Sequence, residues 1–219
     1  SLQQFKEVLL RLQNEEHAAN INLVTPTHYT PSIAAALGEL RDSRVLTIPV
    51  VYNTSSFDSL EALSLMRGKV DVYLADFKYA SALEAGKLSH APRYPEIALA
   101  AIEEMVAQVP VWEEDDEGLL LKGVIVRHLV LPGRVEESKR ALATLHDRFG
   151  SSVRLSIMSQ YTPLASGLER YGLAGRVTEE EYEEVLDYAD SLGVEDYFWQ
   201  QGDAAQESFV PEFNGEGVR

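Results

Sequence analysis

Apolar runs rich in β-branched residues alternate along this chain with segments of helical periodicity. Each of the four clearest runs ends in a polar cluster, and with those clusters they span residues 20–28, 48–54, 70–78 and 123–133. Runs of this kind, separated by helices, predict an α/β protein with a parallel sheet that is buried on both faces. Ligands bind beyond the carboxyl ends of the strands in such sheets. The polar clusters are therefore candidate site residues, and the runs before them are scaffold.

Helical spacing, caps and turn residues predict the elements in more detail. Two apolar stretches flank an acidic turn within residues 109–122, which predicts a hairpin. Strands are expected at residues 21–25, 47–52, 70–77, 123–131, 153–160 and 196–200. Helices are expected over residues 2–14, after an N-cap at Thr30, from Asp58 or Ser59 to Met66, from Pro95, over 135–149 and after a capping box that begins at Thr178.

Length bounds the number of domains, and hydropathy bounds the class of protein. The chain has 219 residues, enough for one core, so a single α/β domain is expected over residues 1–201, followed by a polar tail over 202–219. A mean hydropathy of −0.15 describes a soluble protein, and no run is apolar enough to cross a bilayer. The first residues resemble neither a signal peptide nor a transit peptide. A cytoplasmic protein that does not act on membranes is expected.

Charge bears on the choice of partners. The formal net charge is −16, and residues 178–219 hold 13 acidic residues and one basic residue, so −12 of the charge lies there. A nucleic-acid groove needs the opposite sign, so no nucleic acid is expected as a partner. The acidic segment is interpreted as a solvated helix face with an acidic tail, or alternatively as a surface for a basic partner.

The lack of cysteine is the strongest compositional constraint. Without cysteine, this chain cannot form disulfides, thiolate zinc sites or cysteine-held iron–sulfur clusters. Its five histidines are scattered, and none has the spacing of a metalloprotease, so no metal site is expected. The sequence also lacks a Walker loop, a GxSxG elbow and a GxGxxG fingerprint, which argues against the common hydrolases, nucleotide-phosphate enzymes and dehydrogenases.

Polar residues at the first three strand ends each have two interpretations. Asn53 and Thr54 either make ordinary turn bonds to the backbone, as such residues usually do, or hold a polar group of a ligand. Asp76 and Lys78 point to the same face of an extended chain, where they form either a structural ion pair or part of a site. His28 follows the first run and, in the functional interpretation, is an acid–base group or a ligand contact.

The fourth run contains a charged residue among apolar ones. Arg127 is costly among valines and leucines unless it is paired, so its expected partner is Asp76 or a ligand carboxylate. His128 faces the opposite side of the strand and is interpreted as a packed, hydrogen-bonded structural histidine. The sequence predicts that four side chains converge on one face at the carboxyl ends of the strands: Asn53, Asp76, Lys78 and Arg127.

Taken together, several segments resemble a known family. They read NINLVTPTHY at 20–29, PVVYNTS at 49–55, DVYLADFKY at 71–79, VRHLVLPG at 126–133 and SQYTP at 159–163. Their combination is similar to the radical S-adenosylmethionine superfamily, in the branch described as resembling the pyruvate formate-lyase activating enzyme. The resemblance extends over residues 5–217.

The resemblance implies a fold and a chemistry. The fold is an incomplete, open, TIM-like parallel β/α barrel of about five to six strands here, without the family's first strand. The implied cofactors of the full-length protein are S-adenosylmethionine and one [4Fe–4S] cluster, which a three-cysteine loop holds. Reductive cleavage of S-adenosylmethionine gives a 5′-deoxyadenosyl radical that abstracts hydrogen. In the activating enzymes the target is a backbone glycine of a glycyl-radical enzyme, which is the implied protein partner.

The resemblance also implies cofactor contacts for residues at the first two strand ends. Thr25 and His28 would stand where relatives meet the amino group of S-adenosylmethionine. Asn53 and Thr54 would lie near its methionine or ribose part.

The later strand ends supply the remaining implied contacts. Asp76 and Lys78 would contact the carboxylate of the cofactor or the substrate. Arg127 would contact the carboxylate or the ribose. Gln160 and Tyr161 would flank the adenine.

The chain departs from the family pattern in several places. The first strand and the cysteine loop are missing, Ala75 replaces an expected proline, and Ser56 stands where a glycine is expected. A Cβ at that position disfavours positive φ. Two hypotheses follow. The chain is the C-terminal barrel portion of a longer enzyme, inactive by itself and without bound cofactor, or it is a degenerate, cluster-free relative that acts as a small-molecule-binding or protein-docking module.

A last expectation concerns the edge of the run at residues 20–25, which lacks a strand if the family's first strand is missing. The run is apolar and contains no lysine, and such an edge tends to recruit another strand. It is expected to pair with a second copy in a two-fold homodimer, or to be covered by the helix of residues 2–14 or by the acidic tail.

Overall fold

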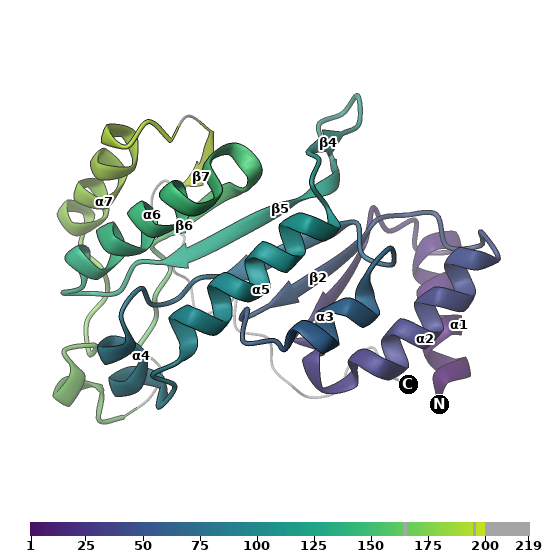
Figure 1. Ribbon diagram of the computed structural model, residues 1–219, viewed down its shortest axis with the longest axis horizontal. Coiled ribbons are helices and arrows are strands. Elements are labelled where there is room, and N and C mark those ends of the chain that lie inside the picture. The colour runs from purple at the N-terminus through teal and green to yellow at the C-terminus, as the bar shows by residue number, and fades with distance from the viewer. Residues whose placement is uncertain (164–165, 195, 200–219) are drawn as a thin grey trace.

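The computed structural model is an open, mostly parallel sheet with helices packed against it (Figure 1). It describes residues 1–163, 166–194 and 196–199. The strand order is β1-β2-β3-β5-β6-β7, each neighbouring pair in this order is parallel, and β4 pairs antiparallel with β5. The predicted α/β class and open parallel sheet are confirmed. The strands are β1 Ile21–Val24, β2 Val50–Thr54, β3 Val72–Asp76, β4 Glu113–Glu114, β5 Leu120–Leu129, β6 Arg154–Met158 and β7 Tyr197–Trp199.

Helices begin where the sequence supplies caps. Ser59 Oγ accepts the backbone N–H of Ala62 at 3.1 Å, and Thr178 forms the predicted capping box with Glu181. No helix in the described part of the chain is long and apolar enough to cross a membrane. The helices are α1 Leu2–Asn14, α2 Thr30–Asp42, α3 Leu60–Met66, α4 Ala82–Ser89, α5 Tyr94–Gln108, α6 Val135–Phe149 and α7 Glu179–Ser191, with 3₁₀ turns η1 Pro26–Tyr29, η2 Gly150–Ser152 and η3 Leu168–Tyr171.

Three local predictions were wrong in detail. Strand β2 begins at residue 50 rather than 47, because the side-chain oxygen of Gln13 accepts the backbone N–H groups of Thr47 and Ile48 before the ladder begins. Thr30 lies inside α2, because η1 precedes that helix and Tyr29 takes the cap position. Helix α4 was not predicted, and Gly86 in its interior obscures the pattern.

The two faces of the sheet differ, which corrects the prediction that both are buried. Helices α3, α5 and α6 lie in front of the sheet in Figure 1, and the side chains directed toward the helices are buried. A valine, leucine, isoleucine or phenylalanine side chain among them contributes about 1.5–3 kcal/mol when fully buried. Alternate residues face the other way and mostly keep part of their surface exposed. We call this second side the open face, and its strand residues include Val24, Val51, Asn53, Leu74, Asp76, Ile125, Arg127, Leu129, Ser156 and Met158.

The predicted hairpin covers part of the open face near the amino-terminal half of β5. Glu113 of β4 pairs with Lys122 of β5, and a register shift follows. Gly123 has no side chain, and a Cβ there would lie 2.6 Å from the ring of Trp112. The guanidinium of Arg154 in turn lies 4.6 Å from the centre of a Trp112 ring. Glycine at position 123 therefore lets an aromatic ring rest directly on the strand.

Strand β1 has one strand neighbour, β2, in the described part of the chain. Helix α1 packs beside α2, where Lys6 Nζ lies 2.6 Å from Glu39 Oε2. Gln13 also donates to the carbonyl of Val45 at 2.9 Å and so holds α1 to the segment before β2. The tail of residues 202–219 lies outside the described residues, and pairing of β1 with a second copy stays a prediction.

Candidate functional site

Four polar side chains meet on the open face at the carboxyl ends of the strands. Arg127 of β5 is the register partner of Asp76 in β3, and its Nε donates to Asp76 Oδ1 at 2.8 Å. The Nη2 of Arg127 donates to Asn53 Oδ1 of β2 at 2.8 Å. Lys78 Nζ lies 3.1 Å from Asp76 Oδ2. The predicted convergence is confirmed, and we call these residues the Arg127 cluster.

The Arg127 cluster is locally positive in an acidic protein. It combines Arg127 and Lys78 with one carboxylate, Asp76, which gives +2 − 1 = +1, whereas the whole chain carries −16. Arg127 Nη1 and Asn53 Nδ2 have no hydrogen-bond partner within the described residues. Side-chain exposure is 23% for Arg127 and 45% for Lys78, so both donors reach the surface. A ligand carboxylate or other anionic oxygen suits these donors.

Thr54 lies on the opposite side from the cluster, because neighbouring residues of a strand face opposite sides. Its hydroxyl donates to Asp58, which also accepts from Thr27 Oγ1 at 2.8 Å and from the Tyr52 hydroxyl at 3.3 Å. Burial, followed by the nearby charge of Asp58, raises the pKa of Tyr52 to about 12. Thr54 therefore belongs to a buried network that fastens η1 to the end of β2.

The two predicted residues after β1 lie at the exposed rim. Thr25 has a left-handed φ of 51°, and its N–H donates to the carbonyl of Asn53 at 2.8 Å. Its backbone therefore adjoins the Arg127 cluster. His28 lies in η1 with its side chain exposed. The structure records no direct contact between its side chain and the Arg127 cluster.

Neither of the two predicted residues after β6 hydrogen-bonds to a side chain of the Arg127 cluster. Gln160 is exposed, and its Nε2 lies 3.6 Å from the sulfur of Met158. The Tyr161 hydroxyl donates to the carbonyl of Leu173 at 2.9 Å. Tyr161 thus fastens the segment that follows β6.

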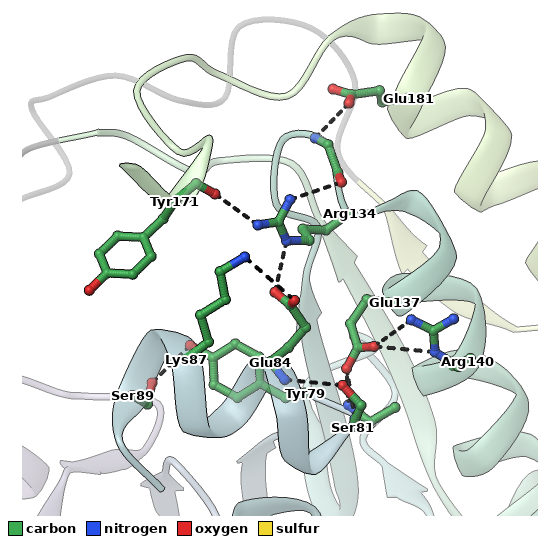
Figure 2. A network of polar contacts seen from close by, with 12 residues as sticks. Tyr79, Ser81, Glu84, Lys87, Ser89, Arg134, Glu137, Arg140, Tyr171 and Glu181 are labelled. Atoms are coloured by element: carbon green, nitrogen blue, oxygen red, sulfur yellow. Dashed lines mark hydrogen bonds and ion pairs between the residues drawn. The ribbon is translucent and has the colours of Figure 1, made fainter. Parts of the chain in front are cut away.

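A second polar network, which was not predicted, holds the loops at the same end of the sheet (Figure 2). Arg134, at the N-cap of α6, donates to Glu84 of α4 at 2.8 Å and to the carbonyl of Tyr171 at 2.8 Å. The N–H of Gly133 donates to Glu181 of α7 at 2.7 Å. The network joins four elements that are far apart in sequence.

Glu137 is the buried member of this second network. Its Oε1 accepts the backbone N–H groups of Ala80 and Ser81 at 2.8 and 2.7 Å, and its Oε2 accepts from Arg140 at 2.8 Å. Burial opposes ionisation, but these hydrogen bonds outweigh it and lower the pKa of Glu137. The carboxylate therefore stays charged and holds the turn after β3.

His128 is structural, as predicted. Its Nδ1 lies 2.8 Å from the carbonyl of Phe77 and its Nε2 lies 2.9 Å from Ser138 Oγ. The carbonyl can only accept, so Nδ1 carries the proton and Nε2 accepts from the serine hydroxyl. Burial lowers the pKa of His128, against the opposing effect of the Phe77 carbonyl.

Sequence reasoning missed Tyr94, the first residue of α5. It is 4% exposed, and its hydroxyl contacts the backbone of the segments after β2 and β3. The nearest sequence signal is Pro95, which marks a helix start but says nothing about a buried hydroxyl.

Comparison with known proteins gives similarities at low identity. The chain is 28% identical over 182 residues to the uncharacterized protein MJ0674 of Methanocaldococcus jannaschii, a match that covers 82% of this chain and 48% of that protein. The chain thus spans about half the length of the curated relative that it matches. It is also similar to the structure of a radical SAM methyltransferase from Sphaerobacter thermophilus, with a TM-score of 0.41 and 12% identity over 82% of this chain and 59% of that one. No family model matches the chain.

The residues present do not fit a thiolate-held metal centre. The chain contains no cysteine, and the described residues include no group of three or more histidine or acidic side chains placed to hold a metal ion. The donors in the Arg127 cluster instead suit an organic anion.

Proposed function

We propose that this chain is the barrel portion of a radical S-adenosylmethionine enzyme and that the Arg127 cluster receives the carboxylate of S-adenosylmethionine. The observation that carries the proposal is a net-positive cluster with free donors at the carboxyl ends of parallel strands, where ligands of such sheets bind. The motif resemblance supplies the identity of the ligand. A branch similar to the pyruvate formate-lyase activating enzyme, with a glycyl-radical enzyme as protein substrate, is the finer form of the proposal.

The roles of the cluster residues follow from their contacts. Arg127 Nη1 and Lys78 Nζ offer positive donors to a carboxylate, and Asn53 Nδ2 offers a neutral donor beside them. Asp76 keeps both cations in place, because each of its oxygens accepts from one of them. When bound, S-adenosylmethionine would supply the radical chemistry together with an iron–sulfur cluster, which this cysteine-free chain does not hold. The contribution of this chain is to bind and orient the cofactor.

Calorimetry with S-adenosylhomocysteine tests this proposal on the chain itself. Lys78→Ala should weaken binding about five- to tenfold, because a charged donor to the carboxylate is lost. Its stability should change by no more than about 0.5 kcal/mol, because exposed ion pairs contribute little. Lys122→Ala is the matched control, since this exposed lysine pairs with Glu113 away from the cluster. Lack of binding to the unmodified chain, or equal loss in both variants, would contradict the proposal.

A cluster-free binding module is the second candidate function, and the lack of cysteine favours it. Iron and sulfide assays on the full-length protein separate the two. If the chain is part of an enzyme, the full-length protein should hold an iron–sulfur cluster and form 5′-deoxyadenosine after reduction. This chain alone should do neither. An iron-free full-length protein that binds S-adenosylhomocysteine would establish the binding module instead.

We also propose that the outer edge of β1 pairs with a second copy in a two-fold dimer. The strand has one strand neighbour in the described residues, and Val24 is 66% exposed. The acidic charge opposes association, so raising the salt concentration should strengthen it. Light scattering across a salt series measures this, and a monomer at every salt concentration would refute it.

A further inference from the structure

Tyr94 contacts both strand ends that carry the Arg127 cluster, and it does so from the helix-covered side of the sheet. Its Oη lies 2.9 Å from the carbonyl oxygen of Ser55 and 2.9 Å from that of Asp76. The N–H of Lys78 donates to the same Oη at 3.0 Å. One buried hydroxyl therefore joins the segment after β2 to the end of β3.

The Tyr94 hydroxyl makes hydrogen bonds to both segments at the point where the β2–β3 ladder ends. The last register pair of these strands is Thr54 with Ala75, so the backbone groups beyond it have no ladder partner between the two strands. On its other side β3 is still held, because the N–H of Phe77 donates to the carbonyl of Arg127 at 2.8 Å. Without the Tyr94 hydroxyl, the Lys78 N–H would lose its acceptor, and the partly buried carbonyls of Ser55 and Asp76 would lose the proton that they share.

The ring of Tyr94 is fixed on several sides. It stacks on Phe57 and Phe77 with ring centres 6.1 and 6.5 Å apart, and it meets Tyr79 edge-on at 5.6 Å. A ring held in this way cannot swing to follow a displaced strand end. This packing holds the hydroxyl in place between the two strand ends.

The spacing of these strand ends decides whether Arg127 can reach both of its partners. Arg127 holds Asp76 Oδ1 through Nε at 2.8 Å and Nη2 at 2.7 Å, and the same Nη2 donates to Asn53 Oδ1 at 2.8 Å, all within one planar guanidinium. Asn53 lies two residues before Ser55, while Asp76 and Lys78 bond to Tyr94 through their own backbone. Because Nη2 lies between Asn53 and Asp76, a change in the gap between β2 and β3 would lengthen its contact with one of them.

We infer that Tyr94 is a positioning residue for the Arg127 cluster: its hydroxyl sets the gap between the ends of β2 and β3 and so aligns Asn53, Asp76 and Lys78 for an anionic ligand. The ligand rests on the proposed function, but the alignment does not depend on it. Tyr94 does not touch the ligand.

Tyr94→Phe tests the inference, because it removes the hydroxyl and keeps the ring. Tyr73→Phe is the matched control, since Tyr73 is also fully buried and its hydroxyl donates to Gln108 at 2.7 Å, away from the cluster. Amide exchange and ¹⁵N NMR of the ligand-free chain report the Lys78 N–H and the Arg127 Nε–H directly. Calorimetry with S-adenosylhomocysteine reports binding.

In Tyr94→Phe, exchange at the Lys78 N–H should rise about tenfold, and the Arg127 Nε–H signal should shift or exchange faster. The affinity for S-adenosylhomocysteine should fall about fivefold, as expected when about one hydrogen bond's worth of alignment is lost. Tyr73→Phe should lose stability without any of these changes. An unchanged Arg127 Nε–H signal in Tyr94→Phe would overturn the inference, whether or not the unmodified chain binds S-adenosylhomocysteine. Failure of the unmodified chain to bind would overturn only the proposed function.

Discussion

The two faces of the sheet are built from the same strands but have different tasks. On β5, Val126 and His128 face the helices and are buried, whereas Ile125 and Arg127, which alternate with them, lie on the open face and stay partly exposed. Because side chains alternate, each strand can supply core and site at the same time. Stability should therefore depend mainly on one set of alternate residues, and ligand binding on the other.

Truncating one leucine on each face should give the largest contrast. Leu155→Ala on the helix-covered face removes a side chain that is 5% exposed, and it should cost about 3 kcal/mol of unfolding free energy. Leu74→Ala on the open face should cost about 1 kcal/mol, because that side chain is only partly buried. Urea denaturation measures both. Equal losses would show that the open face is covered in solution.

The pH dependence of stability should follow His128. Burial lowers the pKa of His128 in the folded state. Below the pKa of about 6.5 that histidine has in the unfolded chain, the unfolded chain therefore binds more protons than the folded chain. Stability is therefore complete above about pH 6.5 and falls as the pH drops, by up to about 1.4 kcal/mol per unit.

Urea denaturation between pH 7.5 and 5.5 measures this slope. His128→Gln should lower stability at neutral pH but flatten the slope. A slope that survives in His128→Gln would assign the effect to another group.

The turn that leaves β2 should give the smallest effect, and one of opposite sign. Ser56 is fully buried with a φ of 61°, and its Oγ has no hydrogen-bond partner in the described residues. Ser56→Gly should stabilise the fold by about 1 kcal/mol, because it relieves the left-handed backbone and removes an unsatisfied hydroxyl.

His90→Gly is the matched control for Ser56→Gly. It relieves a similar φ of 53° at the C-cap of α4, where the side chain is exposed and no hydroxyl is buried. His90→Gly should raise the free energy of unfolding by about 0.5 kcal/mol. A loss of stability in Ser56→Gly would mean that the void left by the side chain outweighs the strain.

Strand-end reasoning predicted the Arg127 cluster because it needs only two rules. Parallel strands bring their carboxyl ends to one edge, and residues two apart face the same side, as Asp76 and Lys78 do. The same alternation separates Thr54 from its neighbour Asn53, so the sequence already contained the signal that Thr54 faces the helices. The resemblance grouped the two, and the structure divides them.

Other features left no such signal. Val51, Leu74 and Ile125 are apolar although they lie on the open face, so the sequence of these strands predicts burial on both sides. The role of Tyr94 depends on where α5 begins in space relative to two strands that precede it in the chain. Contacts of this kind arise from packing between distant segments, which periodicity does not encode.

The ring that Gly123 admits gives the open face a measurable depth. Trp112 lies over the strand at residue 123, and Arg127 marks the opposite end four residues later. At about 3.3 Å per residue, the two are about 13 Å apart along β5. The stretch of open face between them therefore has a set length, with a guanidinium at one end and an aromatic ring at the other.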